Sequence, residues 1–284
     1  MKNYDNMSLD KKVGFLEKGH IYELIENPNM AFNSVTTIIK DLHEEFKTDE
    51  IIQEIINNPK SPYYKGDPEE IKKKWREKAE KASGEGTLLH AYGEALFKGT
   101  KIKNPPVHLP KAEYVPIIIE ELYAKGYELA KAELLVYSEI LALAGQSDII
   151  LKKKDPLTGE YDYMIYDWKF LGKPLQKNSR YDPTTRKYKM MYGPFKYLKD
   201  CNWIHYSIQL AIYQALIGTP EKVKEKVLVC VYDDGYEYVP AYPIRVFWDE
   251  NLELQAVYET WGGKIYNSRT GKFTKTWPKD IKGR

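Results

Sequence analysis

Residues 139–169 place two aspartates and a lysine on segments that are typical of neighbouring β-strands. Side chains two apart in a strand point to the same face, so Asp167 and Lys169 should project together while Trp168 points the other way. If the strand that carries Asp148 pairs with this one, its carboxylate joins them. Two hard oxygen ligands beside a cation suit a Mg²⁺-dependent attack on a phosphodiester.

The same residues also have a plain structural interpretation. Asp148 and Asp167 could be ordinary strand-end or turn residues, and Asp167 could simply form an ion pair with Lys169. However, Asp167 follows the apolar run Met164-Ile165-Tyr166. Aspartate is depleted in strands and is rarely buried without a partner. The metal site is therefore the hypothesis, and the ion pair remains the alternative.

Two expected helices carry further polar candidates. His90 lies near the start of a helix that begins at Gly86; a lone helical histidine is more often structural, but beside two carboxylates it would complete a mixed nitrogen and oxygen metal site. Gln209 and Tyr213 are four residues apart and share one helix face. An amphipathic core helix explains its apolar residues but not the glutamine, which could orient a phosphate or a metal-bound water.

A segment rich in basic and aromatic residues, 176–200, follows the strand that carries Lys169. Its basic residues could bind the phosphates of a nucleic acid, and the aromatic residues between them could stack on its bases. The alternative is an ordinary solvated surface. The residues concerned include Lys177, Arg180, Arg186, Lys187, Lys189, Lys196 and Lys199, interleaved with Tyr181, Tyr188, Tyr192, Phe195 and Tyr197.

Composition narrows the class of protein. The 284 residues are 43% hydrophobic and 30% charged with a net charge of +2, so any nucleic-acid surface must be local. The two cysteines, Cys201 and Cys230, cannot form a four-thiolate zinc or iron–sulfur site, and they fit a reducing compartment. The polar segment 1–12 lacks an apolar signal-peptide core, and no run is long enough to span a bilayer. We expect a cytoplasmic protein without a membrane partner.

Local signals predict alternating helices and strands. Ser34 is an expected N-cap, and Asp67-Pro68 is an expected helix start. The expected elements are a hairpin over 13–26, helices over 34–46, 67–83, 86–98 and 114–127, strands over 133–143, 146–153 and 161–170, a helix over 206–217, a hairpin of 227–232 with 236–245, and a final helix from 249 to about 266.

In this order the motifs resemble the PD-(D/E)XK nuclease superfamily and, within it, the RecB-like exonuclease branch. The branch pattern is matched by Gly86-Thr87-Leu88-Leu89-His90, by Glu139 with Gly145 and Asp148, by Asp167-Trp168-Lys169, and by Gln209 with Tyr213. The motifs span residues 86–213. The N-terminal region also resembles phage-encoded members and the mitochondrial genome maintenance exonuclease.

The resemblance implies an α/β (α+β) fold with a restriction-endonuclease-like core, in which a mixed central β-sheet is flanked by helices and preceded by an N-terminal helical extension. It implies one nuclease domain over 1–284, with an N-terminal subregion at 1–85, a catalytic core at 86–246, and a C-terminal helix and basic tail at 247–284.

The resemblance also implies residue roles. His90, Asp148, Asp167 and the backbone carbonyl of Trp168 would bind Mg²⁺ or Mn²⁺, and Lys169 would position or deprotonate the attacking water. Glu139 would supply a further carboxylate. Gln209 and Tyr213 would fix the substrate backbone or the lysine, and the segment that contains Arg180, Arg186, Lys187, Tyr188 and Tyr192 would bind substrate.

The expected function is a metal-dependent DNA exonuclease that acts on free or single-stranded ends in replication, recombination or repair. The expected partners are DNA and a recombination or replication protein. Some relatives carry a four-cysteine iron–sulfur cluster, which this chain cannot hold. No Gly-x(4)-Gly-Lys-Ser/Thr motor loop is present. A structure-specific endonuclease on the same core and a catalytically inactive DNA-binding protein remain as alternatives.

Overall fold

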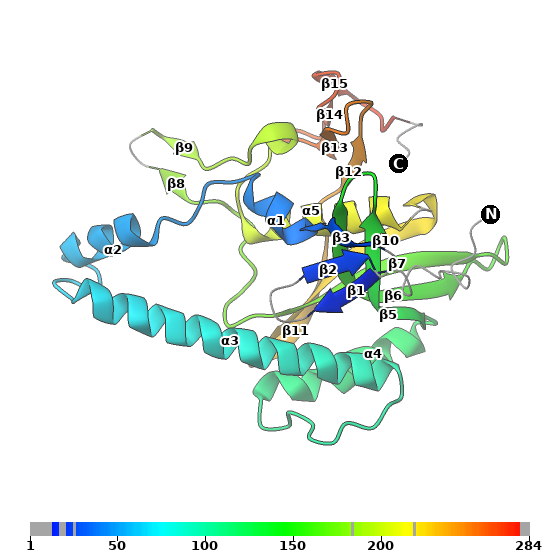
Figure 1. Ribbon diagram of the computed structural model, residues 1–284, viewed down its shortest axis with the longest axis horizontal. Helices are drawn as coiled ribbons and strands as arrows, with labels where there is room; N and C mark the ends of the chain where they lie inside the picture. The colour runs from blue at the N-terminus through cyan, green and yellow to red at the C-terminus, as the bar shows by residue number, and fades with distance from the viewer. Residues whose placement is uncertain (1–12, 17–20, 25–26, 183–184, 218–219, 279–284) are drawn as a thin grey trace.

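A mixed β-sheet of six strands flanked by helices forms the centre of the protein, which is the α+β architecture expected from the sequence (Figure 1). The computed structural model describes residues 13–16, 21–24, 27–182, 185–217 and 220–278. The strand order is β11-β10-β7-β6-β4, and β5 pairs with β6. The strands are β4 (Asn33–Ser34), β5 (Glu128–Ser138), β6 (Leu143–Lys154), β7 (Tyr161–Phe170), β10 (Val223–Tyr232) and β11 (Gly235–Pro240).

The sheet is mixed because a helix connects two of its neighbouring strands. β10 runs parallel to β7, and the connection between them contains helix α5 (Asn202–Leu216), as a parallel pair requires a long crossover. β5, β6 and β7 form the antiparallel meander that the sequence predicted. The strand carrying Asp148 and the strand carrying Asp167 are therefore direct neighbours.

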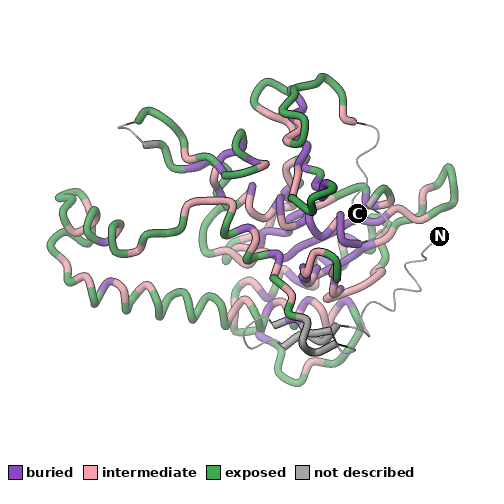
Figure 2. Tube along the Cα trace, turned by 45° about the horizontal axis from the view of Figure 1, so that its top comes forward, coloured by how far each residue is buried: buried purple, intermediate pink, exposed green. Residues whose placement is uncertain are grey.

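Alternation along β7 divides the core into two layers. Tyr163 and Ile165 pack in the cluster that contains residues of α1 (Val35–Lys40) and α5. Met164, Tyr166 and Trp168 pack in the opposite cluster, against α3 (Pro68–Phe97) and α4 (Tyr114–Ala124). The buried residues are concentrated in this central region, whereas the outer part of α3 is largely exposed (Figure 2).

Helix α3 is longer than expected. Asp67 caps it as predicted by accepting the N–H of Glu69, but it continues without a break through Gly84 and Gly86 to Phe97. The prediction of two helices was wrong because glycine inside a helix costs only about 1 kcal/mol, less than its flanking helix formers and its packing supply. The helix also crosses the expected boundary between residues 85 and 86. With α2 (Thr48–Asn57), its first half projects from the body of the protein (Figure 1).

The boundaries of other elements also differ from the sequence prediction. Ser34 caps α1 by accepting the N–H groups of Thr36 and Thr37, but α1 ends at Lys40, not at Phe46. The strand expected to begin at Glu133 begins at Glu128 and ends at Ser138. Helix α5 agrees with its prediction, although it starts four residues earlier.

The C-terminal region is a sheet, so the expected helix from Asp249 was wrong. The Asp249 carboxylate accepts the N–H groups of Asn251 and Glu253 and so closes a turn, which is the other common use of an N-cap residue. An antiparallel sheet follows, consisting of β12 (Ile244–Trp248), β13 (Leu254–Glu259), β14 (Ile265–Asn267) and β15 (Lys272–Thr274).

The remaining strands are peripheral. The predicted N-terminal hairpin is present as β1 (Val13–Leu16) and β2 (Ile21–Leu24), extended by β3 (Asn27–Ala31); its expected turn near residues 18–19 lies outside the described residues. A short hairpin, β8 (Tyr181–Asp182) with β9 (Lys187–Tyr188), interrupts the segment between β7 and α5. Within the described part of the chain, none of the helices has the length and apolar character needed to cross a membrane.

Candidate active site

The two central strands separate at the pair of aspartates. The ladder between β6 and β7 is continuous from Lys154–Tyr161 to Ile149–Tyr166 and ends there. At the next position Asp148 Oδ2 accepts the backbone N–H of Trp168 at 2.8 Å, so a side chain replaces the missing ladder bond. The carboxylate is thereby fixed at the point where the sheet opens.

Asp167 and Lys169 form an ion pair on one face of β7, as the strand alternation predicted. Asp167 is only 2% exposed, and burial raises its pKa to about 6 despite the opposing charge of Lys169. Burial alone would lower the pKa of Lys169, but the carboxylates of Asp167 and Asp148 outweigh it and hold that pKa above its ordinary value. The ammonium also lies over the ring of Tyr206, 4.5 Å from its centroid. The plain ion pair is thus present, and it lies beside Asp148.

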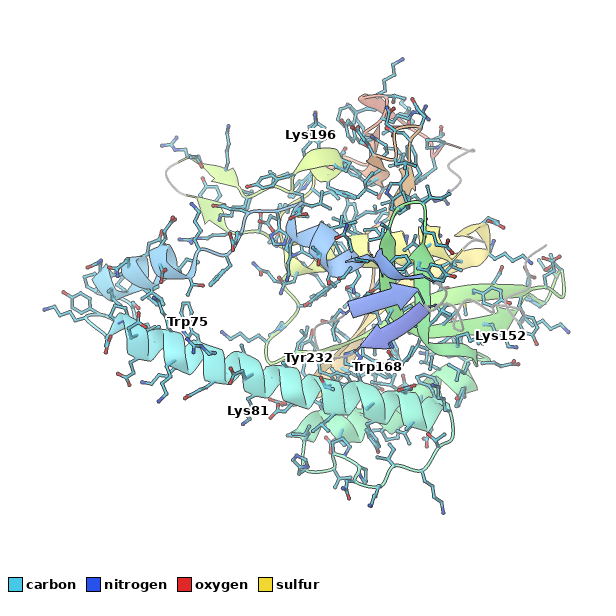
Figure 3. All side chains as sticks on the ribbon, in the orientation of Figure 1. Trp75, Lys81, Lys152, Trp168, Lys196 and Tyr232 are labelled. Atoms are coloured by element: carbon cyan, nitrogen blue, oxygen red, sulfur yellow. The ribbon has the colours of Figure 1, made fainter. Side chains whose placement is uncertain are left out.

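Helix α3 brings His90 to the same place. His90 Nδ1 lies 3.3 Å from Asp148 Oδ2. One turn later, Gly93 faces the indole of Trp168 closely: a Cβ on Gly93 would lie 3.1 Å from Trp168 Nε1. This close approach determines the distance between α3 and the sheet, and therefore the distance between His90 and Asp148. Figure 3 shows Trp168 where α3 crosses the sheet.

A cavity of about 650 Å³ opens in front of these residues. Its lining includes His90, Glu133 and Asp148, and one possible ligand atom from each of these three lies within 4.8 Å of the others. Gln209 and Tyr213 of α5 also border it. Helices from both faces of the sheet therefore meet the opened strands at one cavity.

Glu133 is a site residue that the sequence interpretation missed. It lies on β5 with φ 51°, a conformation that is uncommon for a residue with a side chain and that costs on the order of 1–3 kcal/mol. Gln146 Nε2 donates to its carboxylate at 2.5 Å. Burial, together with the charge of Asp148, raises the pKa of Glu133 to about 8. A cation bound between Glu133 and Asp148 would reduce the electrostatic repulsion between their carboxylates.

The raised pKa of Glu133 predicts how stability depends on pH. Between the ordinary value of 4.5 and about 8, the folded protein retains a proton that the unfolded chain has released. The free energy of unfolding of the metal-free protein should therefore fall as pH rises through this window. Urea denaturation in EDTA at several pH values measures the decline, and Glu133→Gln should flatten it. Equal pH slopes for the two proteins would contradict the assignment.

Glu139 was wrongly expected at the site. It lies exposed in the turn between β5 and β6, next to the pair Ser138–Leu143. Five residues separate Leu143 from Asp148, which corresponds to roughly 16 Å along a strand. The end of the strand decides this outcome: β5 ends at Ser138, so Glu139 falls in the turn, and the pairing register places Glu133 beside Asp148.

Gly145 allows α5 to approach the opened strand. A Cβ at this position would lie 2.6 Å from Tyr213 Cε1 and 3.0 Å from Val35 Cγ2. Tyr213 is buried, and its hydroxyl accepts a hydrogen bond from Gln209 Nε2 at 2.8 Å. The glycine thus positions the Gln209–Tyr213 pair against the cavity.

Gly145→Ala should therefore destabilise the protein and displace Tyr213. Overpacking of this kind costs about 1–3 kcal/mol. Denaturant unfolding measures the effect, and Gly172→Ala is the matched control because nothing lies within 4 Å of its would-be Cβ. The close packing would be disproved if the two alanine variants were equally stable.

The donor set fits the cation that the resemblance implies. Glu133 and Asp148 offer carboxylate oxygens and His90 offers an imidazole nitrogen, a combination that accepts Mn²⁺ readily and Mg²⁺ through its oxygens. Asp167 is engaged by Lys169 and does not border the cavity. Trp168 contributes its N–H to Asp148, and the role of its carbonyl as a ligand stays a prediction.

The basic and aromatic segment lies outside this cavity. Arg180 pairs with Glu54 of α2 at 3.0 Å, and both border a second cavity of about 740 Å³. Arg186, Lys187 and Tyr188 are exposed on the β8–β9 hairpin. Tyr192 is also exposed. The structure therefore brings His90, Asp148, Gln209 and Tyr213 together at the cavity of about 650 Å³, with Asp167 and Lys169 behind it, but it does not bring these segment residues there.

Comparison of the sequence with protein-family models and with curated proteins finds no match.

Proposed function

We propose that this protein is a Mg²⁺-dependent deoxyribonuclease that hydrolyses phosphodiester bonds at free or single-stranded DNA ends, in replication, recombination or repair and as part of a phage-like system. One observation carries the proposal. Asp148 meets His90 where β6 and β7 separate, at the wall of a cavity, and the Asp167–Lys169 pair lies behind it. The motif resemblance supplies the reaction class.

The side chains have distinct tasks in this proposal. His90, Glu133 and Asp148 would hold the cation, which would polarise a phosphate oxygen and lower the pKa of a water molecule. Lys169 is fixed by Asp167 and by the ring of Tyr206. Because its pKa is held above the ordinary value, Lys169 acts as an ammonium that orients the attacking water and stabilises charge on the phosphate, not as a base.

A cleavage assay with defined substrates tests the proposal. Purified protein and Mg²⁺ are incubated with 5′-labelled and 3′-labelled linear DNA and with circular DNA of the same sequence. We expect stepwise shortening of linear DNA and resistance of the circle. Nicking of the circle would indicate a structure-specific endonuclease instead, and binding without any Mg²⁺-dependent cleavage would indicate a DNA-binding protein.

The β8–β9 hairpin should affect DNA affinity and leave the chemistry intact. Arg186 and Lys187 are exposed, so each can contact a phosphate and release counterions. Arg186→Ala with Lys187→Ala should flatten the slope of log affinity against log salt by about 1.4 units on single-stranded DNA. Arg180→Ala should have a smaller effect because Glu54 already engages that side chain. Fluorescence anisotropy with labelled single-stranded DNA at several salt concentrations measures the slopes.

The matched control for this prediction is Lys153→Ala with Lys154→Ala. These exposed lysines lie at the far end of β6, on the other side of the molecule from the hairpin (Figure 1). The control removes the same charge and should leave the slope nearly unchanged. Equal slopes in both double variants would place the DNA path away from the hairpin.

A further inference from the structure

A second cluster of metal-binding side chains lies between the chain that follows α1 and the start of α5. It consists of His43, Asp200 and His205, and one possible ligand atom from each lies within 4.8 Å of the others. All three are half-buried, and all three border the cavity of about 740 Å³. This cavity and the catalytic cavity have no lining residue in common among the residues described.

The hydrogen bonds already orient the donors of this cluster. His43 Nδ1 lies 3.0 Å from the backbone oxygen of Glu44, so it is the protonated nitrogen and Nε2 carries the lone pair. A backbone carbonyl that fixes one nitrogen of a histidine is the usual support behind a metal-ligating imidazole. His205 Nε2 lies 2.7 Å from Asp200 Oδ1, and the two imidazole rings stack with centroids 4.2 Å apart.

The backbone holds these residues from several directions. His205 lies in the first turn of α5, where its N–H bonds the carbonyl of Cys201. The N–H of Asp200 bonds the carbonyl of Lys189, whose ammonium pairs with Glu44 at 2.6 Å. Binding of a ligand would therefore require little additional ordering of the backbone.

The charge around the cluster also favours a cation. The residues that border this cavity include five acidic side chains and three basic ones. They are Glu44, Glu45, Glu50, Glu54 and Asp200 against Lys47, Arg180 and Lys189.

We propose that His43, Asp200 and His205 form a site for a Zn²⁺-class transition metal, separate from the catalytic site. Two imidazoles and a carboxylate are typical zinc ligands, whereas Mg²⁺ prefers oxygen ligands alone. The ion would lie between His205 Nε2 and Asp200 Oδ1, with the ring proton of His205 on Nδ1, and His43 would offer Nε2. The cavity side remains open for a water ligand.

Such an ion would connect two elements that lead to the catalytic cavity. α1 begins at Val35, which borders that cavity together with the capping residue Ser34, and α5 carries Gln209, which also borders it. The cluster lies at the opposite end of α1 and at the first turn of α5. The metal would therefore fix the base of the β8–β9 segment and the relative position of the two helices.

Cobalt binding tests the site without any cleavage assay. The background variant His90→Ala with Asp148→Asn removes ligands of the catalytic site, and Co²⁺ replaces Zn²⁺ as a visible probe. We expect one Co²⁺ per chain, with visible absorption bands. Adding His43→Ala or His205→Ala should weaken binding by about 100-fold or more, whereas adding the exposed His108→Ala should not.

Chemical protection provides a second measurement on the unmodified protein. Zn²⁺ should shield His43 and His205, but not His108, from diethylpyrocarbonate, as read by mass spectrometry. Zn²⁺ should also raise the melting temperature by several degrees at a large excess over its dissociation constant. The proposal is overturned if Co²⁺ binding survives both histidine substitutions, or if Zn²⁺ leaves the reactivity of both histidines unchanged.

Discussion

Asp148→Asn will reduce Mg²⁺-dependent DNA cleavage to background, a loss on the order of 10³-fold, while the fold survives. Asp148 Oδ2 faces His90 and also accepts the N–H of Trp168, and the amide of asparagine keeps one oxygen that can hold the Trp168 bond while it removes the carboxylate that would bind the cation. Asp167→Asn should be equally inactive. It will also lower stability, because it leaves the buried ammonium of Lys169 without its partner.

The measurement is single-turnover cleavage of labelled DNA over a range of Mg²⁺ concentrations, with circular dichroism on each variant. Asp162→Asn is the matched control, since Asp162 lies on the same strand, is half-buried and pairs with Lys224 away from the cavity lining. It should retain full activity. Near-normal cleavage by Asp148→Asn would refute the metal assignment.

Lys169→Met should lower kcat by about 10²–10⁴-fold and change the DNA dissociation constant little. Methionine keeps most of the apolar stem but removes the ammonium, which lies over the ring of Tyr206. A group that acts mainly on the transition state affects kcat more than ground-state binding. Lys169→Arg should recover only part of the activity, because a planar guanidinium cannot reproduce the compact charge beside Asp167.

Rapid-quench kinetics together with equilibrium binding separates these effects. Lys152→Met is the control, because Lys152 on the neighbouring strand β6 also lies over an aromatic ring, that of Tyr161, and does not border the cavity. Figure 3 shows Lys152 well separated from Trp168. Lys152→Met should leave both kcat and the DNA dissociation constant nearly unchanged. If Lys169→Met weakened binding while kcat stayed constant, Lys169 would be a phosphate contact and the proposed chemistry would be wrong.

Local sequence alone was sufficient for several elements of this protein. Strand alternation placed Asp167 and Lys169 on one side and Trp168 on the other, because side-chain direction along a strand depends only on local geometry. The capping roles of Ser34 and Asp67 likewise depend on a few neighbouring N–H groups. The meander of β5, β6 and β7 followed from its turns and apolar runs.

Features that depend on distant packing could not be predicted in this way. Gly84 and Gly86 suggest a break, but α3 is continuous because tertiary contacts and strong neighbours outweigh a small local preference. Asp249 closes a turn and not a helix, since the same side-chain hydrogen bonds serve both.

The sequence by itself determined which residues could do chemistry: the Asp167–Lys169 pair, Asp148, and the shared helix face of Gln209 and Tyr213. Only the tertiary structure decided which carboxylate joins them. Glu133 faces the cavity, and Glu139 lies in a turn, because the register between β5 and β6 is set by pairing over the whole strand. Spacing along a chain fixes the direction of neighbouring side chains, but distances between elements depend on how they pack.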